Sequence, residues 1–535
     1  MSTSADRPLN RREFISQASC AAVGSSALFS TLLTLRLANS LAAQTVATSG
    51  DYRALVCLFL AGGNDSFNML MPTTSGEYEA YAKKRGPLAL TKDTLLEITP
   101  SNLGGRTLGI HPAMPEVRDL FNARRLSFIS NVGSLIRPLT LTDYKAGRYL
   151  PVSLYSHADQ VKQWQTCMPD QRTAIGWGGR AADIIKSLNS PSLVSMNISL
   201  SGQNVFLTGK QAFTYAVGAN GATALTGYSP TAVNNLTALR TKGVSSIVDQ
   251  NYRNLFEQTY AQSTSDAVDS YYSFAAALSG VTLKTPIPAG NSLATNLATI
   301  ARVISSNQGF GARRQIFFVQ IGGWDNHTDL FSNQQNNLGM VSKAIDTFSS
   351  ALTEIGMADK VTLFTASDFG RTLSSNSTGS DHAWGANHLV MGGAVNGGKV
   401  AGDSANGYYP DFQKISELDT GAGRIIPGIA VDEYARELLS WFGISNGDMD
   451  YVLPSFSTRF SGRQALGLFP SPITVAPTVA PPVVSTAPAS SGGGGGGGGA
   501  ASPIFLGALS ALALLRLRQK RLAKRKAKDV PPSTT

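Results

Sequence analysis

Side chains of the kind that bind metal ions gather in one stretch of this sequence. An apolar run at residues 361–366 is followed closely by Asp368. Further along the same stretch come Asp381 and His382, and then His388. The whole chain has five histidines, so two of them within this stretch form a clear concentration. Carboxylates supply negative charge and imidazoles are borderline-soft ligands, a combination that suits a divalent ion such as Zn²⁺, Mn²⁺, Mg²⁺ or Ca²⁺.

More residues of these types follow other apolar runs. Asp325 and His327 belong to a Gly-Gly-Trp-Asp-Asn-His motif, and Asp65 belongs to a Gly-Gly-Asn-Asp motif. If the runs are parallel strands of one sheet, their carboxyl ends meet at one edge and these side chains lie together there. Carboxylates packed so closely repel one another unless a cation neutralises them. The predicted metal ligands are Asp65, Asp325, His327, Asp368, His382 and His388.

The elements that must position these residues are visible as alternating patterns. Apolar runs typical of strands buried on both faces lie at 53–60, 126–131, 315–321, 361–366 and 388–391, with further strands expected at 193–200 and 204–207. Helical patterns lie at 77–85, 116–123, 158–164, 173–187, 292–306, 333–357 and 432–441. The alternation predicts an α/β fold with a mostly parallel sheet sandwiched by helices. Residues 208–290, rich in Ala, Ser, Thr, Asn and Tyr, predict a helical insertion that could cover the site.

Several polar residues have both a functional and a structural interpretation. Ser156 precedes a predicted helix, where it either caps the helix or acts as a nucleophile, since free N–H groups and the helix dipole favour an anion there. Arg371 either grips an anionic ester oxygen, because a guanidinium matches phosphate and sulfate geometry, or forms a structural ion pair. Asp65 could equally cap a helix, and His111 is interpreted as a packed histidine at a helix entrance.

A resemblance to a known family rests on four motifs. Gly-Gly-Asn-Asp, Gly-Gly-Trp-Asp-Asn-His, Ser-Asp-Phe-Gly-Arg-Thr and Asp-His-Ala-Trp-Gly resemble the domain of unknown function 1501 family over about residues 52–465. That family is commonly exported by the twin-arginine route. It is similar to the alkaline phosphatase and sulfatase superfamily, whose members hydrolyse phosphate or sulfate esters with one or two metals. The resemblance therefore implies an alkaline-phosphatase-like fold around a metal site.

The same resemblance assigns roles to single residues. It implies that Asp65, Asp325, His327 and Asp368 are metal ligands, that His382 or His388 supplies the late histidine, and that Ser156, with His157 beside it, is the best nucleophile candidate. Phe369 stands where the superfamily often has histidine, which argues against a full two-metal site. No Cys-x-Pro-x-Arg signature occurs, which argues against a formylglycine sulfatase.

Both ends of the chain have targeting features. Residues 1–43 predict a twin-arginine signal peptide, because an Arg-Arg pair precedes a mildly apolar stretch and a region of small residues. Residues 44–470 form the predicted α/β domain, 471–499 a Pro/Ala/Thr and then poly-Gly linker, and 500–535 a short apolar helix with a basic tail. The apolar part of this tail reaches only about 20 Å, short of a ~30 Å hydrocarbon core.

The tail resembles a GlyGly-type C-terminal sorting tail, with a plain membrane anchor as the alternative. This implies the twin-arginine translocase and a rhomboid-like sorting protease as partners, and the periplasm or outer cell surface as the destination. The membrane would be contacted through the tail.

Charge and cysteine content exclude some classes of protein. The net charge is +10, but residues 44–500 carry only +1, so the basic balance belongs to the ends and does not predict nucleic-acid binding. Cys57 and Cys167 could form one disulfide in an oxidising compartment, or stay as buried free thiols. The leading hypothesis is an exported metal-dependent hydrolase of small anionic phosphate or sulfate esters, with a serine or water nucleophile. The alternative is a non-catalytic cell-surface protein that keeps the fold and its metal for stability.

Overall fold

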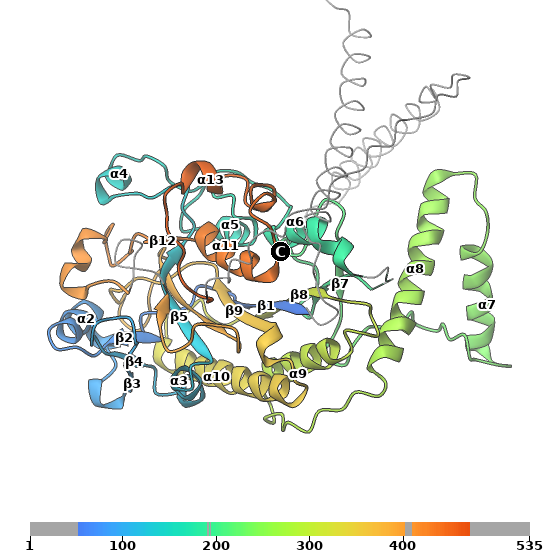
Figure 1. Ribbon diagram of the computed structural model, residues 1–535, viewed down its shortest axis with the longest axis horizontal. Helices are drawn as coiled ribbons and strands as arrows, with labels where there is room; N and C mark the ends of the chain where they lie inside the picture. Colours follow the sequence, from blue (N-terminus) through green and yellow to red (C-terminus); the bar gives the residue numbers. More distant parts are fainter. Residues whose placement is uncertain (1–51, 190–191, 193, 402–408, 471–535) are drawn as a thin grey trace, which may run out of the picture. The chain divides into compact units, whose positions relative to one another are not determined.

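The strand β1 (Arg53–Leu60) is the central strand of the main sheet, and all but its first residue are buried. The computed structural model in Figure 1 describes residues 52–189, 192, 194–401 and 409–470. In this part of the chain the main sheet has nine strands in the order β11-β5-β10-β9-β1-β8-β6-β7, with β12 beside β5. The other strands are β5 (Leu126–Gly133), β6 (Asn197–Ser199), β7 (Thr214–Ala216), β8 (Arg314–Ile321), β9 (Val361–Ser367), β10 (Ala386–Met391), β11 (Val400–Ala401) and β12 (Ile429–Ala430).

Strand directions make this a mixed, mostly parallel sheet. β1 is parallel to both β8 and β9, and β6 continues the parallel order next to β8. β10 runs antiparallel to β5 and β9 and is the exception. A small antiparallel sheet of β2 (Leu70–Pro72), β4 (Leu108–Ile110) and β3 (Leu96–Ile98) lies outside the main one. The predicted fold class, a mostly parallel sheet between helices, is confirmed.

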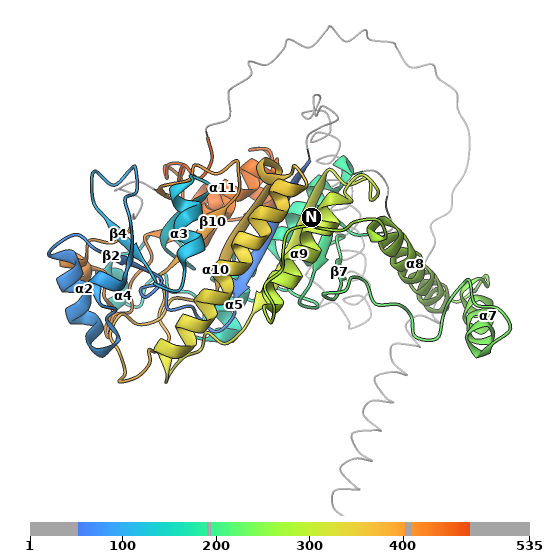
Figure 2. The ribbon, with the colours of Figure 1, turned by 90° about the horizontal axis from the view of Figure 1, so that it is seen from below.

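Helices cover both faces of the sheet (Figures 1 and 2). Successive residues of a strand point to opposite faces, so β1 contributes Val56 and Leu58 to one core and Cys57 and Phe59 to the other. The first core contains α3 (Pro115–Asn122), α9 (Ser292–Ser305) and α10 (Leu330–Glu354). The second contains α5 (His157–Thr166), α6 (Trp177–Ile185) and α11 (Val431–Phe442). The remaining α-helices are α2 (Glu77–Arg85), α4 (Leu141–Lys145), α7 (Leu236–Val248), α8 (Leu255–Leu278), α12 (Met449–Val452) and α13 (Phe456–Arg459).

The segment predicted as a helical insertion, residues 208–290, contains α7 and α8, which contact each other, while α8 also contacts α9. It also contains β7, which the sequence did not indicate and which extends the main sheet beside β6. The strand predicted at 204–207 is wrong. Those residues form a turn in which the Asn204 side chain accepts a hydrogen bond from the Leu207 N–H at 2.9 Å. A side chain that bonds its own local backbone in this way competes with strand pairing.

Other sequence-based expectations concern the thiols and the chain ends. Cys57 and Cys167 are both buried and free, so the disulfide alternative does not hold. Among the described residues, no helix has the length and apolar character needed to cross a bilayer. The predicted signal peptide, linker and tail, at 1–43, 471–499 and 500–535, lie outside the described residues.

Candidate metal centre

Three neighbouring strands end at the same level and place their following residues side by side. Leu60 at the end of β1 pairs with Ile321 of β8 and with Ser367 of β9. Immediately beyond these ends, the Gly62 N–H donates to the Asp368 carboxylate at 2.8 Å. The Gly62 carbonyl accepts from the Arg371 guanidinium at 3.0 Å, and this guanidinium also donates to Asp325 at 2.9 Å. The predicted meeting of strand-end residues therefore occurs for Asp325 and Asp368.

Gly62 allows this close approach because of its conformation. Its φ is +121°, a region that side chains rarely adopt, and a Cβ there would lie 2.6 Å from the Asp325 amide nitrogen. A Cβ on Gly63 would lie 2.7 Å from the ring of Phe369. The two glycines thus let the end of β1 pack directly against residues after β8 and β9.

Two histidines reach the same place from outside the parallel strands. His157 is the first residue of α5, and His382 lies on the connection between β9 and β10. The residue before the helix cap, Tyr155, has φ +74°, and its carbonyl faces Nδ1 of His382 at 3.0 Å. A non-glycine residue at positive φ is an uncommon conformation that costs free energy, and such positions gather at functional sites.

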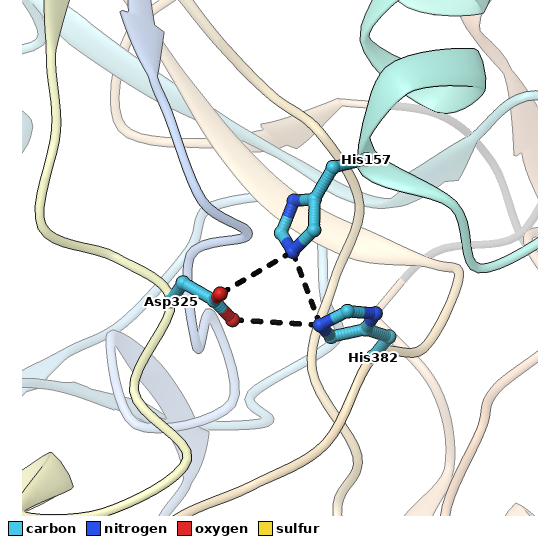
Figure 3. A group of neighbouring side chains, drawn as sticks. All are labelled: His157, Asp325 and His382. Carbon is cyan, nitrogen blue, oxygen red and sulfur yellow. Dashed lines mark hydrogen bonds and ion pairs between the residues drawn. The ribbon is translucent and has the colours of Figure 1, made fainter. Parts of the chain in front are cut away.

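Side chains of His157, Asp325 and His382 point toward a common centre (Figure 3). One ligand atom from each lies within 4.8 Å of the others. Nε2 of His157 is 3.0 Å from Nε2 of His382 and 3.5 Å from an Asp325 oxygen, and His382 Nε2 is 3.4 Å from the other Asp325 oxygen. We refer to these three residues as the ligand triple.

A third imidazole lies beside the ligand triple. Nε2 of His327 is 3.0 Å from Nε2 of His382 and 3.0 Å from Asp325 Oδ1. His327 is not a member of the triple, but it contacts two of its members, and about half of its side chain is exposed to solvent. The site is therefore open to solvent on the side of His327.

The proton positions follow from the second nitrogen of each ring. Nδ1 of His157 faces Asp368 at 2.6 Å, Nδ1 of His327 faces Asp381 at 3.2 Å, and Nδ1 of His382 faces the Tyr155 carbonyl. Carboxylates and carbonyls only accept hydrogen bonds, so we assign the proton of each ring to Nδ1. Each neutral ring then presents an unshared electron pair on Nε2, and these pairs face one another.

This donor set fits a divalent metal ion. The Nε2 electron pair of His382 lies 3.0 Å from Nε2 of His157 and 3.0 Å from Nε2 of His327, next to a carboxylate, and such pairs repel one another unless a cation lies among them. Donors bound to tetrahedral Zn²⁺ at about 2.0–2.1 Å lie roughly 3.3 Å apart, close to the separations within the triple. Imidazole ligands whose other nitrogen donates to a carboxylate or carbonyl are the usual arrangement at such centres.

Arg371 governs the charge of the site from a fully buried position. Each of its three guanidinium nitrogens donates to the protein: to Ser380, to the Gly62 carbonyl and to Asp325. Partial burial raises the pKa of Asp325, but the hydrogen bond and charge of Arg371 outweigh it and hold this pKa below its usual value. Burial lowers the pKa of His382 and the charge of Arg371 lowers it further, which favours the neutral form of the ring. Both residues are thus kept in the form that binds metal.

Phe369 forms one wall of the site. Its ring centroid lies 4.7 Å from that of His157 and 4.8 Å from that of His382. Phe369 therefore packs against both imidazoles and supplies no ligand atom. It fixes the planes of the two rings, which the Nδ1 hydrogen bonds alone leave free to tilt.

The structure does not bring Asp65 or His388 into this cluster. Asp65 is fully buried and pairs with Arg85, and its Oδ2 accepts from Ser380, which in turn bonds Arg371. His388 lies within β10, fully buried, with its ring centroid 4.6 Å from that of Trp164. Asp65 lies behind the site through Ser380 and Arg371, and a ligand role for either residue stays a prediction.

Ser156 is adjacent to the cluster in sequence. It occupies the cap position of α5 but makes no capping bond, and its hydroxyl donates to Asp159 at 3.1 Å. Asp159 is held in turn by Arg172. Burial lowers the pKa of His111 to about 4, and its Nδ1 accepts from the Ala113 N–H, as a packed histidine at a helix entrance does.

His157 is the member of the ligand triple that the sequence patterns do not indicate as a metal ligand. The sequence places it only beside Ser156, because no apolar run precedes it and periodicity shows only a helix start. One feature of the sequence does point to His157. The chain has five histidines, and only His157 has neither a predicted ligand role, as His327, His382 and His388 have, nor a predicted packing role, as His111 has.

Comparison with known proteins adds a family match and distant structural similarity. The model of DUF1501, described as a protein of unknown function, matches residues 232–416. This match is shorter than the expected 52–465, and it includes Asp325, Asp368 and His382 but not His157. No curated protein matches the sequence.

Solved structures similar to this chain are distant. The periplasmic C-terminal domain of EptC from Escherichia coli in complex with Zn is 9% identical, with a TM-score of 0.34, covering 76% of this chain and 88% of that one. The PsFucS1 sulfatase from Pseudoalteromonas sp. is 9% identical, with a TM-score of 0.28 and coverage of 78% and 72%. The lipoteichoic acid synthase LtaP from Listeria monocytogenes is 7% identical, with a TM-score of 0.26 and coverage of 70% and 74%.

Proposed function

We propose that this protein is an exported metal-dependent hydrolase of phosphate or sulfate esters. The observation that carries the proposal is the ligand triple, His157, Asp325 and His382, whose imidazoles have their Nδ1 protons held by acceptors. Three protein ligands leave a position open, as catalytic zinc sites do. Imidazole-rich donor sets favour Zn²⁺ over Mg²⁺ or Ca²⁺, so we propose zinc.

A divalent ion held there would polarise an ester oxygen and make a water molecule a better nucleophile at neutral pH. The protein's own part is to fix the donors. Asp368 and the Tyr155 carbonyl orient the rings of His157 and His382, Arg371 keeps Asp325 ionised, and Phe369 packs under both rings. Because Arg371 is buried and bonded to the protein, we assign it to positioning Asp325 rather than to gripping substrate.

Water is proposed as the nucleophile in preference to Ser156. The Ser156 hydroxyl donates to Asp159, whose own oxygen is bound by Arg172. The hydrogen bond from Arg172, with a smaller contribution from the Ser156 hydroxyl, holds the pKa of Asp159 below its usual value, so Asp159 is a poor base for a serine proton. His327, held by Asp381 and half exposed, is placed to carry a proton between the reacting atoms and solvent.

Export forms the second part of the proposal. The Arg-Arg pair and apolar stretch within residues 1–43 support passage through the twin-arginine translocase, and the glycine run and basic tail of 471–535 support sorting to the cell surface by a rhomboid-like protease. Mass spectrometry of the mature protein from its native host tests this. Both ends are expected to be removed, and an intact tail on the mature protein would contradict the sorting role.

The catalytic proposal is tested on purified protein loaded with Zn²⁺, Mn²⁺ or Mg²⁺. Bound metal is measured by elemental analysis, and hydrolysis is followed with aryl phosphate and aryl sulfate esters. We expect about one zinc per chain and turnover that Asp325→Asn abolishes and Ser156→Ala largely retains. Bound zinc without turnover on either ester class would favour the non-catalytic surface protein, and a chain that binds no metal would overturn the site.

A further inference from the structure

The site contains a second arginine whose environment differs from that of Arg371. Arg424 lies on the turn between Asp419 and Ile425, partly exposed, and its Nε donates to the His382 carbonyl at 3.0 Å. The guanidinium lies over the ring of Tyr155, 5.2 Å from its centroid. One contact is with a member of the ligand triple, His382, and the other is with Tyr155, whose carbonyl accepts from the ring of that histidine, so this cation lies beside the metal centre.

The backbone that carries Arg424 is firmly held. The Thr420 N–H and hydroxyl both donate to the Arg424 carbonyl, at 2.9 and 3.0 Å, and the Arg424 N–H donates to Gly421 at 3.1 Å. The Asp419 carboxylate accepts from two further N–H groups of the turn. An arginine presented from a fixed turn loses little conformational entropy when it binds a ligand.

The two terminal nitrogens of the Arg424 guanidinium form no hydrogen bond or ion pair with the described residues. Its Nε donates a hydrogen bond to the His382 carbonyl, but no ion pair joins Arg424 to a carboxylate in the part of the chain that the structure describes. The other arginine in contact with the triple, Arg371, is fully buried and bonded through all three nitrogens. Arg424 is therefore the one that can offer its terminal N–H groups to a molecule in the site.

Charge explains why such a group is needed. Three carboxylates, those of Asp325, Asp368 and Asp381, face the cluster, against two guanidinium groups. With neutral imidazoles this gives a net charge of about −1 without metal and about +1 with a divalent ion. An oxoanion is attracted only in the second case, and removing the charge of Arg424 would abolish that positive balance.

We propose that Arg424 binds non-bridging oxygens of a tetrahedral oxoanion ester and selects anionic over neutral esters. The inference rests on the proposed function, since it uses the same metal centre. A planar guanidinium with two terminal N–H groups matches two oxygens of phosphate or sulfate, and a lysine ammonium does not. The aromatic face of Tyr155 below it keeps the fork in plane, and Tyr155 is in turn fixed by its hydroxyl contacts with Tyr144 and Thr420.

The test measures binding separately from turnover. The dissociation constant of inorganic phosphate is measured by calorimetry on the zinc-loaded full chain, for wild type, Arg424→Gln, Arg424→Lys and the control Arg148→Gln. Arg148 pairs with Asp143 on an exposed surface. We expect Arg424→Gln to weaken phosphate binding about tenfold or more and Arg424→Lys to restore part of it, because hydrogen bonds from a charged donor to an oxoanion are stronger than those from a neutral amide. The control is expected to bind phosphate as wild type does.

Two further readouts separate the possible failures. If esters are hydrolysed, Arg424→Gln should raise KM for an aryl phosphate while leaving kcat/KM for a neutral aryl acetate unchanged. Unchanged phosphate binding in Arg424→Gln would overturn the inference, and so would loss of bound zinc in that variant, because Arg424 would then act through His382. If no ester is hydrolysed but phosphate binding depends on Arg424, the inference stands and the hydrolase proposal fails.

Discussion

The hydrogen bond between Asp368 and His157 allows a strong test of the metal centre. Asp368 Oδ2 lies 2.6 Å from His157 Nδ1, and its other oxygen accepts from the Gly62 N–H at 2.8 Å. In Asp368→Asn the amide oxygen can keep the bond to Gly62, so the backbone stays in place. The amide NH₂ then faces the Nδ1–H of His157, donor against donor, and the ring must move its proton to Nε2 or turn away. Either response removes the electron pair that the metal needs.

The expected loss of zinc affinity follows from the role of Asp368 as a hydrogen-bond partner of a metal ligand. Loss of such an outer partner costs about 10–100-fold in metal affinity, or roughly 1.4–2.7 kcal/mol, and the short charge-assisted bond here places the effect near the upper end. Zinc affinity is measured by competition with a chromophoric chelator at pH 7.5, and the free energy of unfolding is measured in urea with chelator present. The stability of the metal-free variant should stay close to wild type.

The matched control is Asp381→Asn. Asp381 makes the same kind of contact, but to His327, at a longer 3.2 Å and in a more exposed position. Because His327 is outside the ligand triple, zinc affinity should change less than about threefold. Wild-type zinc affinity in Asp368→Asn, or a larger loss in Asp381→Asn than in Asp368→Asn, would refute the assignment of His157 as a ligand.

Three further predictions concern packing and pH. Gly62→Ala should lower the free energy of unfolding by at least about 2 kcal/mol more than the control Gly421→Ala does, measured by urea titration. Both glycines have a similar positive φ, but only Gly62 lacks space for a Cβ. Burial lowers the pKa of His388 to about 3, so its neutral form stabilises the fold fully above pH 6.5 and this contribution is lost as the pH falls. Between pH 7 and pH 5 the free energy of unfolding of the wild type should fall by about 2 kcal/mol more than that of His388→Gln. An equal fall in both proteins would contradict the lowered pKa of His388. Burial raises the pKa of Asp432 to about 8, so its contribution is present at low pH and declines toward pH 8. Between pH 6 and pH 8 the free energy of unfolding of the wild type should fall by about 2 kcal/mol more than that of Asp432→Asn. An equal pH dependence of the two proteins would contradict the raised pKa of Asp432.

The central strands could be predicted because burial on both faces produces continuous apolar runs. The run at 53–60 matches β1 at both ends, and those at 315–321 and 361–366 match β8 and β9 to within one residue. The two-residue strands β11 and β12 and the three-residue β7 could not be found, because so few residues carry no periodicity. The antiparallel direction of β10 is likewise set by its pairing with β5 and β9 and not by its own sequence.

The site was predictable only where it follows strand ends. Asp325 and Asp368 come directly after β8 and β9, and the rule for parallel sheets brings them together. His157 comes from a helix start whose location depends on the positive-φ turn before it, which sequence patterns do not show. His388 belongs to the same motif region as His382, but it lies in the middle of a buried strand, so its ring enters the core.

The spacing of the cluster along the chain has a consequence for how the protein matures. His157 and His382 are separated by 225 positions, and the bond from Gly62 to Asp368 spans 306. Contacts this distant form late in folding, since the intervening chain must already be ordered before its ends can meet. Nascent or partly folded chains therefore lack the cluster altogether. Under the proposed export by the twin-arginine translocase, which carries folded proteins, folding is completed in the cytoplasm, and the metal supply of that compartment would decide which ion fills the proposed site.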